Sequence, residues 1–153
     1  MSILETHQQF WPNEATCAAS AAALAQRRGI DQAFIELRGP LGAGKTTFAR
    51  HLLQALGVVG RIRSPTYALM EPYALPGKNL WHFDFYRFND PQEWEDAGFR
   101  DVFSSTGLKL VEWPEKAAGL LPEADVVITI EPGSDDQRRV HLSAQTPLGR
   151  GLL

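Results

Sequence analysis

The chain has 153 residues, of which 44% are hydrophobic and 22% are charged, and its formal net charge is −3 at pH 7. These proportions are ordinary for a globular protein and exclude a disordered or fibrous chain, while the negative charge argues against a broad nucleic-acid-binding surface. A chain of this length can bury about two thirds of the surface that it exposes when unfolded, so we expect residues 1–153 to form one domain.

The ends of the chain and its cysteine content predict a cytoplasmic protein. Cys17 is the only cysteine, so it has no disulfide partner within the chain, which is typical of a reducing compartment. The N-terminal residues MSILETHQQFWPNE lack a basic segment followed by an apolar one. No apolar run approaches the roughly 20 residues of a membrane span, so we expect no membrane association.

The first half of the chain predicts a helix, a strand, a glycine-rich loop and a second helix. Residues 13–29 begin with Asn13, a good capping residue, and are rich in alanine, which favours a helix. Residues 32–37, QAFIEL, are typical of a buried strand. Residues 39–47, GPLGAGKTT, match the phosphate-binding pattern G-x-x-x-x-G-K-[ST]. The following residues, up to 57, favour a helix, so the loop has the strand and helix that such a site requires.

A strand with strict alternation is predicted at residues 79–88, NLWHFDFYRF. Alternation places Trp81, Phe83 and Phe85 on one face, where they would form core, and places His82, Asp84 and Tyr86 on the other.

The remaining elements are a connection, four strands and a short helix. Residues 57–65 favour the connection, and Asp90 followed by Pro91 favours the start of a helix over 90–99. The strands are expected at 66–75, ending near Pro72, and at 107–115, 125–132 and 138–146. Strands and helices in this order are typical of an α/β fold.

The glycine-rich loop has a direct physical interpretation. Gly39, Gly42 and Gly44 leave room for backbone N–H groups to surround phosphate oxygens, and the helix that follows adds the positive end of its dipole. Lys45 would reach the β and γ phosphates, and the Thr46 hydroxyl would bind Mg²⁺. The alternative is a glycine-rich turn with a chance lysine, which the flanking strand and helix disfavour.

Two carboxylates lie where a hydrolytic site would need them. Glu112 ends the apolar segment LKLVE, and Asp84 lies late in the alternating strand, opposite the aromatic residues. Because open α/β sheets bind ligands at the carboxyl ends of their strands, both acids could hold Mg²⁺ or orient water. Each could instead be a solvated acid or a helix cap.

Two other residues have alternative interpretations, and a third has one. His82 shares a face with Asp84 and would be either an outer partner of the site or a hydrogen-bonded structural histidine. Trp113 would either pack over the site or anchor a partner protein. Cys17, among alanines, is interpreted as an inert packing residue.

Four segments together resemble the TsaE (YjeE) family, the bacterial P-loop ATPases of threonylcarbamoyladenosine synthesis on tRNA. The segments are GPLGAGKTTFAR, SPTYALMEPY, HFDFYRFNDPQEWEDAGFRD and LVEWPEKAAGLLPEADVVI. The resemblance extends from about residue 10 to the end of the chain. It implies a P-loop NTPase-like three-layer sandwich with a mostly parallel central sheet. It also implies an ATP hydrolase that is slow alone, with ATP and Mg²⁺ as cofactors.

The resemblance also implies roles for individual residues. Thr46 and Glu112 would coordinate Mg²⁺, and Asp84 would be an essential acid near the γ phosphate and the metal. Lys45 and Thr66 would act in catalysis, with Thr66 sensing the γ phosphate from the switch-like segment Ser-Pro-Thr at 64–66. The nucleotide would be bound by Pro12, Glu14, Gly39, Leu41, Gly42, Ala43, Gly44, Lys45, Thr46, Thr47 and Arg138.

The partners implied by the resemblance are the TsaB and TsaD proteins. These transfer a threonylcarbamoyl group to an adenosine beside the tRNA anticodon, and hydrolysis by a TsaE-like protein supports their repeated turnover. Contact with tRNA would then be indirect, in keeping with the acidic charge balance.

Three rival functions share the loop. A small P-loop kinase that phosphorylates a small-molecule acceptor would need an acceptor-binding segment and an arginine-bearing lid, and no insertion suggests either. A GTPase would carry N-K-x-D and D-x-x-G, and neither string occurs. A nucleotide-binding module without hydrolysis would not need Asp84 or Glu112 for turnover.

Overall fold

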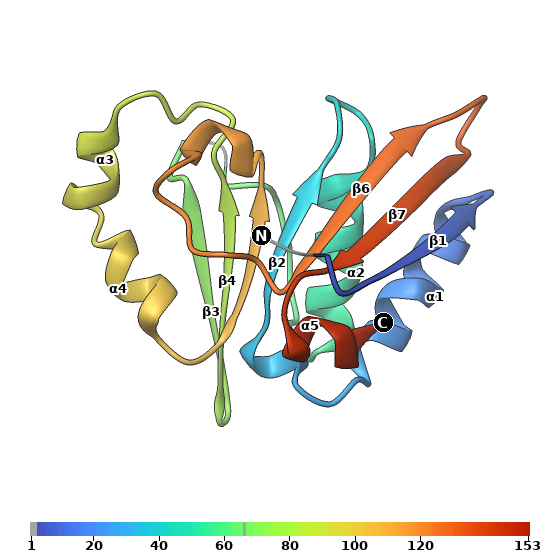
Figure 1. The fold of residues 1–153 in the computed structure, drawn as a ribbon, viewed down its shortest axis with the longest axis horizontal. Coiled ribbons are helices and arrows are strands. Elements are labelled where there is room, and N and C mark those ends of the chain that lie inside the picture. The colour runs from blue at the N-terminus through green and yellow to red at the C-terminus, as the bar shows by residue number, and fades with distance from the viewer. Residues whose placement is uncertain (1–2, 66) are drawn as a thin grey trace.

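The computed structural model describes residues 3–65 and 67–153, which form a seven-stranded sheet with helices packed against it (Figure 1). The strands are β1 (Glu5–Trp11), β2 (Phe34–Arg38), β3 (Met70–Leu75), β4 (Lys78–Asp84), β5 (Leu108–Glu112), β6 (Val126–Pro132) and β7 (Arg138–Ala144). The helices are α1 (Glu14–Ala25), α2 (Lys45–Ala55), α3 (Pro91–Asp96), α4 (Phe99–Ser104) and α5 (Pro147–Leu152), with 3₁₀ turns at Ile30–Gln32 and Pro114–Ala117. Within these ranges no helix combines the length and apolarity that crossing a membrane requires.

The centre of the sheet is parallel, which confirms the predicted α/β class. The spatial order is β1, β7, β6, β2, β5, β4, β3. Strands β6, β2, β5 and β4 run parallel to one another. At one side of them β7 pairs antiparallel with β6 and β1 pairs antiparallel with β7, and at the other side β3 pairs antiparallel with β4. The carboxyl ends of the four central strands therefore meet at one edge of the sheet, where ligands of such folds bind.

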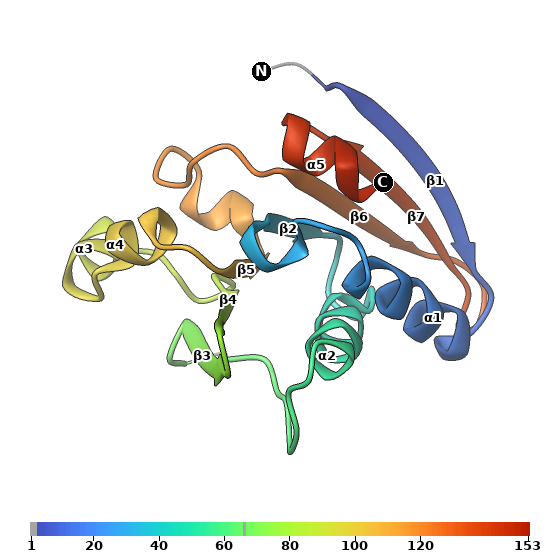
Figure 2. The same ribbon diagram turned by 90° about the horizontal axis from the view of Figure 1, so that it is seen from below.

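Helices cover the two faces of the sheet, as the three-layer prediction requires. Helices α1 and α2 lie on one face, and α3 and α4 lie on the other side, beside β4 and β5 (Figure 2). Alternation along β2 sends Ile35 and Leu37 into the core under α1 and α2, whereas Phe34 joins the aromatic core under α3 and α4. Phe83 and Phe85 lie in that aromatic core, fully buried, as predicted.

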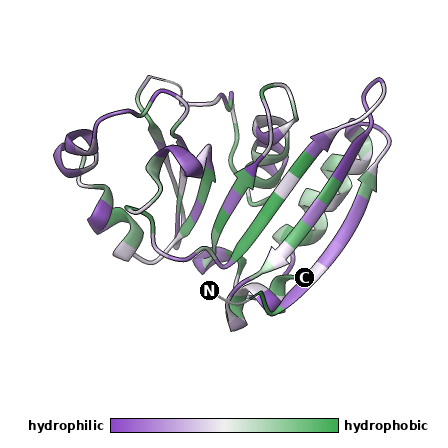
Figure 3. Cartoon of the chain, turned by 45° about the horizontal axis from the view of Figure 1, so that its top comes forward, coloured by the Kyte–Doolittle hydropathy of each residue, from purple (hydrophilic) through white to green (hydrophobic). Residues whose placement is uncertain are grey.

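Two elements at the ends of the chain were not predicted from the sequence. Strand β1, ETHQQFW, is mostly exposed and hydrophilic along most of its length (Figure 3). It is held by pairing with β7 along its whole length rather than by an apolar face. Helix α5 contains Gly149 and Gly151, which disfavour a helix. Its first turn is stabilised by Thr146, whose hydroxyl accepts a hydrogen bond from the Gly149 N–H at 3.0 Å.

Three predicted boundaries are corrected by the structure. Strand β3 contains Pro72 rather than ending near it, which an edge strand tolerates because one side of its backbone needs no partner. Strand β4 ends at Asp84, so Phe85 and Tyr86 follow it. The helix expected over 90–99 ends at Asp96, because Gly98 adopts the left-handed conformation with φ of 69°. A second short helix, α4, which was not predicted, follows from Phe99.

Candidate functional site

The glycine-rich loop connects the carboxyl end of β2 to the start of α2. Helix α2 begins at Lys45, and Gly44 precedes it with φ of 107°, a backbone conformation that glycine adopts without strain. Gly39 has φ of 145°, and a Cβ atom there would collide with the carbonyl oxygen of Ile130 on β6. The loop therefore packs against the neighbouring strand so closely that only glycine fits.

Lys45 is buried and folded back on the loop that carries it. Its Nζ donates hydrogen bonds to the carbonyl oxygens of Gly39 and Pro40, the latter at 3.3 Å, and lies 3.8 Å from the centroid of the Trp113 ring. Burial lowers the pKa of the ammonium, because the charged form loses hydration, while the carboxylates of nearby acids oppose this shift. These acids are Glu112, Glu115 and Asp84.

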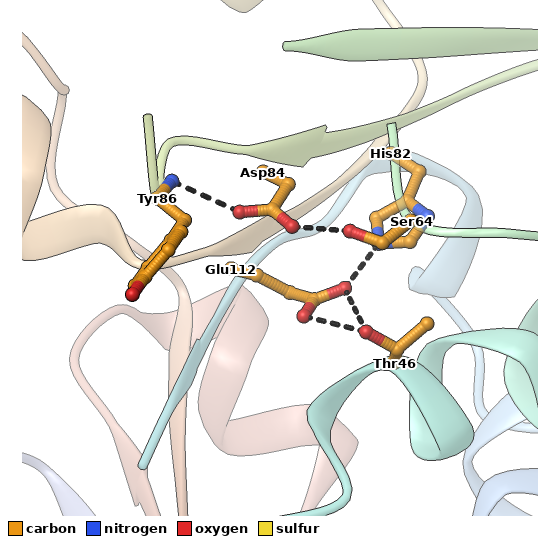
Figure 4. A network of polar contacts seen from close by, with 6 residues as sticks. All are labelled: Thr46, Ser64, His82, Asp84, Tyr86 and Glu112. Carbon is orange, nitrogen blue, oxygen red and sulfur yellow. Dashed lines mark hydrogen bonds and ion pairs between the residues drawn. The ribbon is translucent and has the colours of Figure 1, made fainter. Parts of the chain in front are cut away.

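Thr46 and Glu112 meet at the start of α2. The Thr46 hydroxyl donates to the two carboxylate oxygens of Glu112, at 2.8 Å and 3.1 Å (Figure 4). Both side chains offer oxygen atoms, which Mg²⁺ prefers, and two protein ligands suffice for an ion that keeps several waters and binds phosphate oxygens. The pair therefore fits a Mg²⁺ site, although the described residues contain no group of three or more His, Cys, Asp or Glu suited to a metal ion.

Asp84 lies next to this pair because of the strand register. Strands β4 and β5 are parallel, and Asp84 pairs directly with Glu112. Its carboxylate accepts hydrogen bonds from the Ser64 hydroxyl and from the Tyr86 N–H, the second at 2.9 Å (Figure 4). The two acids predicted from separate strands are thus neighbours, and Ser64 brings the switch-like segment to Asp84. Thr66, predicted to act from the same segment, lies outside the described residues.

Two cavities adjoin the loop and share part of its backbone. The larger, of about 450 Å³, is lined by Leu41, Gly42, Ala43, Gly44, Lys45, Thr46, Thr47, Ser64, Asp84, Tyr86, Arg87, Glu112, Trp113 and Arg138. The smaller, of about 180 Å³, is lined by Trp11, Asn13, Glu14, Cys17, Ala43, Gly44, Thr47, Asp136 and Arg138. The structure thus brings the predicted phosphate, metal and acid residues together around one space and opens a second beside it.

The smaller cavity is lined in part by residues that were predicted to bind the nucleotide. Glu14 lines this cavity, whereas Pro12 is not among its described lining residues. Arg138 lines both cavities, and its guanidinium donates to the carbonyl oxygens of Ala43 at 2.7 Å and Gly42 at 3.3 Å. Arg138 therefore supports the backbone of the glycine-rich loop.

A protein-family model described as "Threonylcarbamoyl adenosine biosynthesis protein TsaE" matches residues 11–140. This range contains the glycine-rich loop, Ser64, Asp84, Glu112 and Arg138. The chain belongs to the TsaE family. It is therefore a member of a family involved in tRNA threonylcarbamoyladenosine biosynthesis.

Similar proteins and a solved structure agree with membership of the TsaE family. A tRNA threonylcarbamoyladenosine biosynthesis protein TsaE from Haemophilus influenzae is 48% identical over 119 residues, covering 78% of this chain and 75% of that protein. A protein of the same name from Bacillus subtilis is 36% identical over 72% of this chain and 68% of its own length. The crystal structure of Bacillus subtilis YdiB superposes with a TM-score of 0.81 at 25% identity, covering 99% of this chain and 94% of that one.

Two aromatic residues, Trp113 and Tyr86, line the larger cavity. Trp113 has a left-handed backbone, with φ of 57° and ψ of 48°, and its ring lies 4.9 Å from the ring of Tyr86. The first of its two interpretations holds, because Trp113 packs over the site, against Lys45. One signal in the sequence pointed to Tyr86 as a lining residue. It follows Asp84 by two residues, on the face opposite the core aromatic residues.

Proposed function

We propose that this chain is a Mg²⁺-dependent ATP hydrolase that acts with the TsaB–TsaD complex in tRNA threonylcarbamoyladenosine biosynthesis. It would work in the cytoplasm as one domain over residues 1–153, slowly when alone and faster with its partners. Its contact with tRNA would be indirect, through that complex. Membership of the TsaE family supports the pathway, and the geometry of the larger cavity supports the activity.

The observation that carries the proposal is the meeting of Thr46 with Glu112 at the mouth of the phosphate loop. A hydroxyl from the first turn of α2 and a carboxylate from the end of β5 form the pair of oxygen ligands that phosphate-loop proteins use for Mg²⁺. Mg²⁺ held there would neutralise charge on the phosphate oxygens and orient them. The loop backbone from Gly39 to Thr47 would bind the same phosphates through its N–H groups.

Lys45 would change partners when ATP binds. Its ammonium now bonds to the carbonyls of Gly39 and Pro40. Phosphate oxygens carry full negative charge and form stronger bonds to an ammonium than neutral carbonyls do. The side chain would therefore turn to the β and γ phosphates and stabilise the charge that develops as the bond to the leaving ADP breaks.

Asp84 would orient the attacking water. Its carboxylate lines the larger cavity and is held by Ser64 and by the backbone of Tyr86, so the direction of its oxygens is fixed. In the reaction the water oxygen bonds to the γ phosphorus, the bond to ADP breaks, and the water releases a proton. Asp84 would accept a hydrogen bond from that water, as a base or as a positioning group.

Phosphate release from ATP tests the proposal. The wild-type chain should hydrolyse ATP slowly with Mg²⁺ and faster when TsaB and TsaD are added. Replacing Lys45, Asp84 or Glu112 by alanine should each lower the rate by about 100-fold or more, while thermal unfolding remains cooperative.

Two outcomes would contradict parts of the proposal. Full activity of Asp84→Ala would remove that residue from the mechanism. Phosphorylation of a small-molecule acceptor, with no effect of TsaB and TsaD on the rate, would favour the kinase alternative instead.

A further inference from the structure

His82 is a fully buried side chain in the site that the mechanism above does not use. It lies on β4, two residues before Asp84, and its exposed fraction is 0%. Its Nε2 atom lies 2.6 Å from Oε2 of Glu112 (Figure 4). Burial of a polar ring costs free energy unless the ring is hydrogen-bonded, and here its partner is the acid that would bind the metal.

The hydrogen bond of the His82 ring to Glu112 shows which ring nitrogen is the donor. An ionised carboxylate only accepts hydrogen bonds, so Nε2 must carry a hydrogen to bond with Glu112. The other ring nitrogen, Nδ1, is buried and has no hydrogen-bond partner among the described residues. Nε2 of His82 is therefore a donor aimed at Glu112.

This donor restricts the direction of the Glu112 carboxylate. Oε2 accepts from His82, and Oε1 accepts from Thr46 at 2.8 Å. A glutamate side chain at a strand end has three rotatable bonds, and without these contacts its carboxylate would sample several directions. His82 lies on β4, the strand beside β5, and Thr46 lies at the start of α2, so the two contacts together fix the direction of the carboxylate.

We infer that His82 is a positioning residue that orients Glu112 for a divalent cation, an inference that rests on the proposed function. The donor at Nε2, and not the volume of the ring, is what the site requires. Residues that hold metal-binding carboxylates in this way typically contribute about 10- to 100-fold to metal affinity.

Matched variants separate the donor from the packing. His82→Gln places an amide N–H near the position of Nε2, His82→Asn places one near the position of Nδ1, and His82→Leu removes the donor. Mg²⁺ is added to each protein with bound mant-ADP, a fluorescent analogue of ADP, and the fluorescence change is followed. The Mg²⁺ concentration at half of this change should be about tenfold or more higher in the leucine and asparagine variants than in the wild type. In the glutamine variant it should stay within about threefold of wild type, because the donor is restored.

Binding of mant-ADP in EDTA provides the internal control. Without a divalent cation all four proteins should bind the probe equally, because His82 does not line the phosphate loop cavity. Unfolding curves in EDTA show which variants fold, and if His82→Leu does not fold, the glutamine and asparagine variants decide. Equal Mg²⁺ dependence in all folded variants, or equal impairment of glutamine and leucine variants, would overturn the inference. Nucleotide binding that ignored Mg²⁺ in the wild type would overturn the proposed function together with it.

Discussion

Cys17 is a buried thiol on the wall of the smaller cavity, and its surroundings keep it protonated. Burial raises its pKa to about 11, and the nearby carboxylate of Glu14 adds to this shift, while Arg50 and Arg138 oppose it. A protonated thiol is a weak nucleophile, so Cys17 behaves as the inert packing residue that the sequence predicted.

The raised pKa of Cys17 predicts a loss of stability in alkaline solution. Between pH 9 and about 11 the folded chain keeps the thiol proton that the unfolded chain, with a pKa near 9, has released. The free energy of unfolding therefore falls as the pH rises through this window. Urea unfolding at pH 8, 9 and 10 should show the difference between wild type and Cys17→Ala shrinking by about 1 kcal/mol per pH unit above 9. If the free energies of unfolding of the two proteins changed in parallel with pH, the raised pKa of Cys17 would be contradicted.

The site acids illustrate how far single residues could be predicted. Asp84 and Glu112 were predicted from their positions late in strands, and the register of β4 and β5 makes them direct neighbours. The role of His82 stayed open, because a buried histidine has the same sequence pattern whether or not its ring meets an acid. The contact with Glu112 exists only in the paired strands.

At the scale of elements, the junction of β2, the glycine-rich loop and α2 depends on one close approach. Gly39 lies against the carbonyl of Ile130, whereas Gly42, with φ of 76°, has open space around its Cβ position. Both glycines have a positive φ, but only Gly39 has a close neighbour at its Cβ position. Comparing substitutions at the two positions therefore separates backbone strain from steric collision.

Replacing each glycine by alanine should separate backbone strain from collision. Gly42→Ala should lower the free energy of unfolding by about 1 kcal/mol, the cost of a left-handed alanine. Gly39→Ala should lower it by about 2 to 4 kcal/mol, because β6 or the loop must also move. Urea unfolding measures both, and nucleotide binding should weaken more in Gly39→Ala. Equal costs for the two substitutions would show that Ile130 does not restrain the loop.

Elements with an apolar pattern were predicted from the sequence, and elements fixed by other contacts were not. Strands β2, β5 and β6 and helix α2 have apolar residues at the spacing of their own structure. Strand β1 has no such pattern, because it lies at the side of the sheet and gains its backbone hydrogen bonds from β7. Helix α5 forms although it contains two glycines, and a Cβ atom on Gly149 would collide with the carbonyl of Asp125.

At the scale of the whole molecule, Asp125 joins parts of the chain that are far apart in sequence. Its carboxylate accepts from the N–H of Phe34, at the start of β2, and from the hydroxyl of Thr146, before α5, at 2.8 Å and 2.6 Å. Its backbone also bonds to Phe34 and to Gln145. These contacts lie at the amino ends of the parallel strands, at the edge of the sheet opposite the site.

Asp125→Ala should therefore lower stability and spare activity. The Phe34 N–H and the Thr146 hydroxyl would lose their acceptor, so the free energy of unfolding should fall by about 2 to 4 kcal/mol. Asp125→Asn, which keeps one carbonyl oxygen, should lose about half as much. Urea unfolding measures the change, and phosphate release well below the unfolding temperature should match wild type. A lower rate in fully folded Asp125→Ala would show coupling between the two edges of the sheet.

Local sequence patterns and spacing were enough to predict the α/β class, the glycine-rich loop with Lys45 and Thr46, and the two acids at strand ends. Which side chains meet follows from the folded arrangement of the strands. Strand order and register place Glu112 against Thr46 and His82, and place Trp113 over Lys45. Such contacts join residues that are tens of positions apart, and their geometry depends on packing that no local pattern encodes.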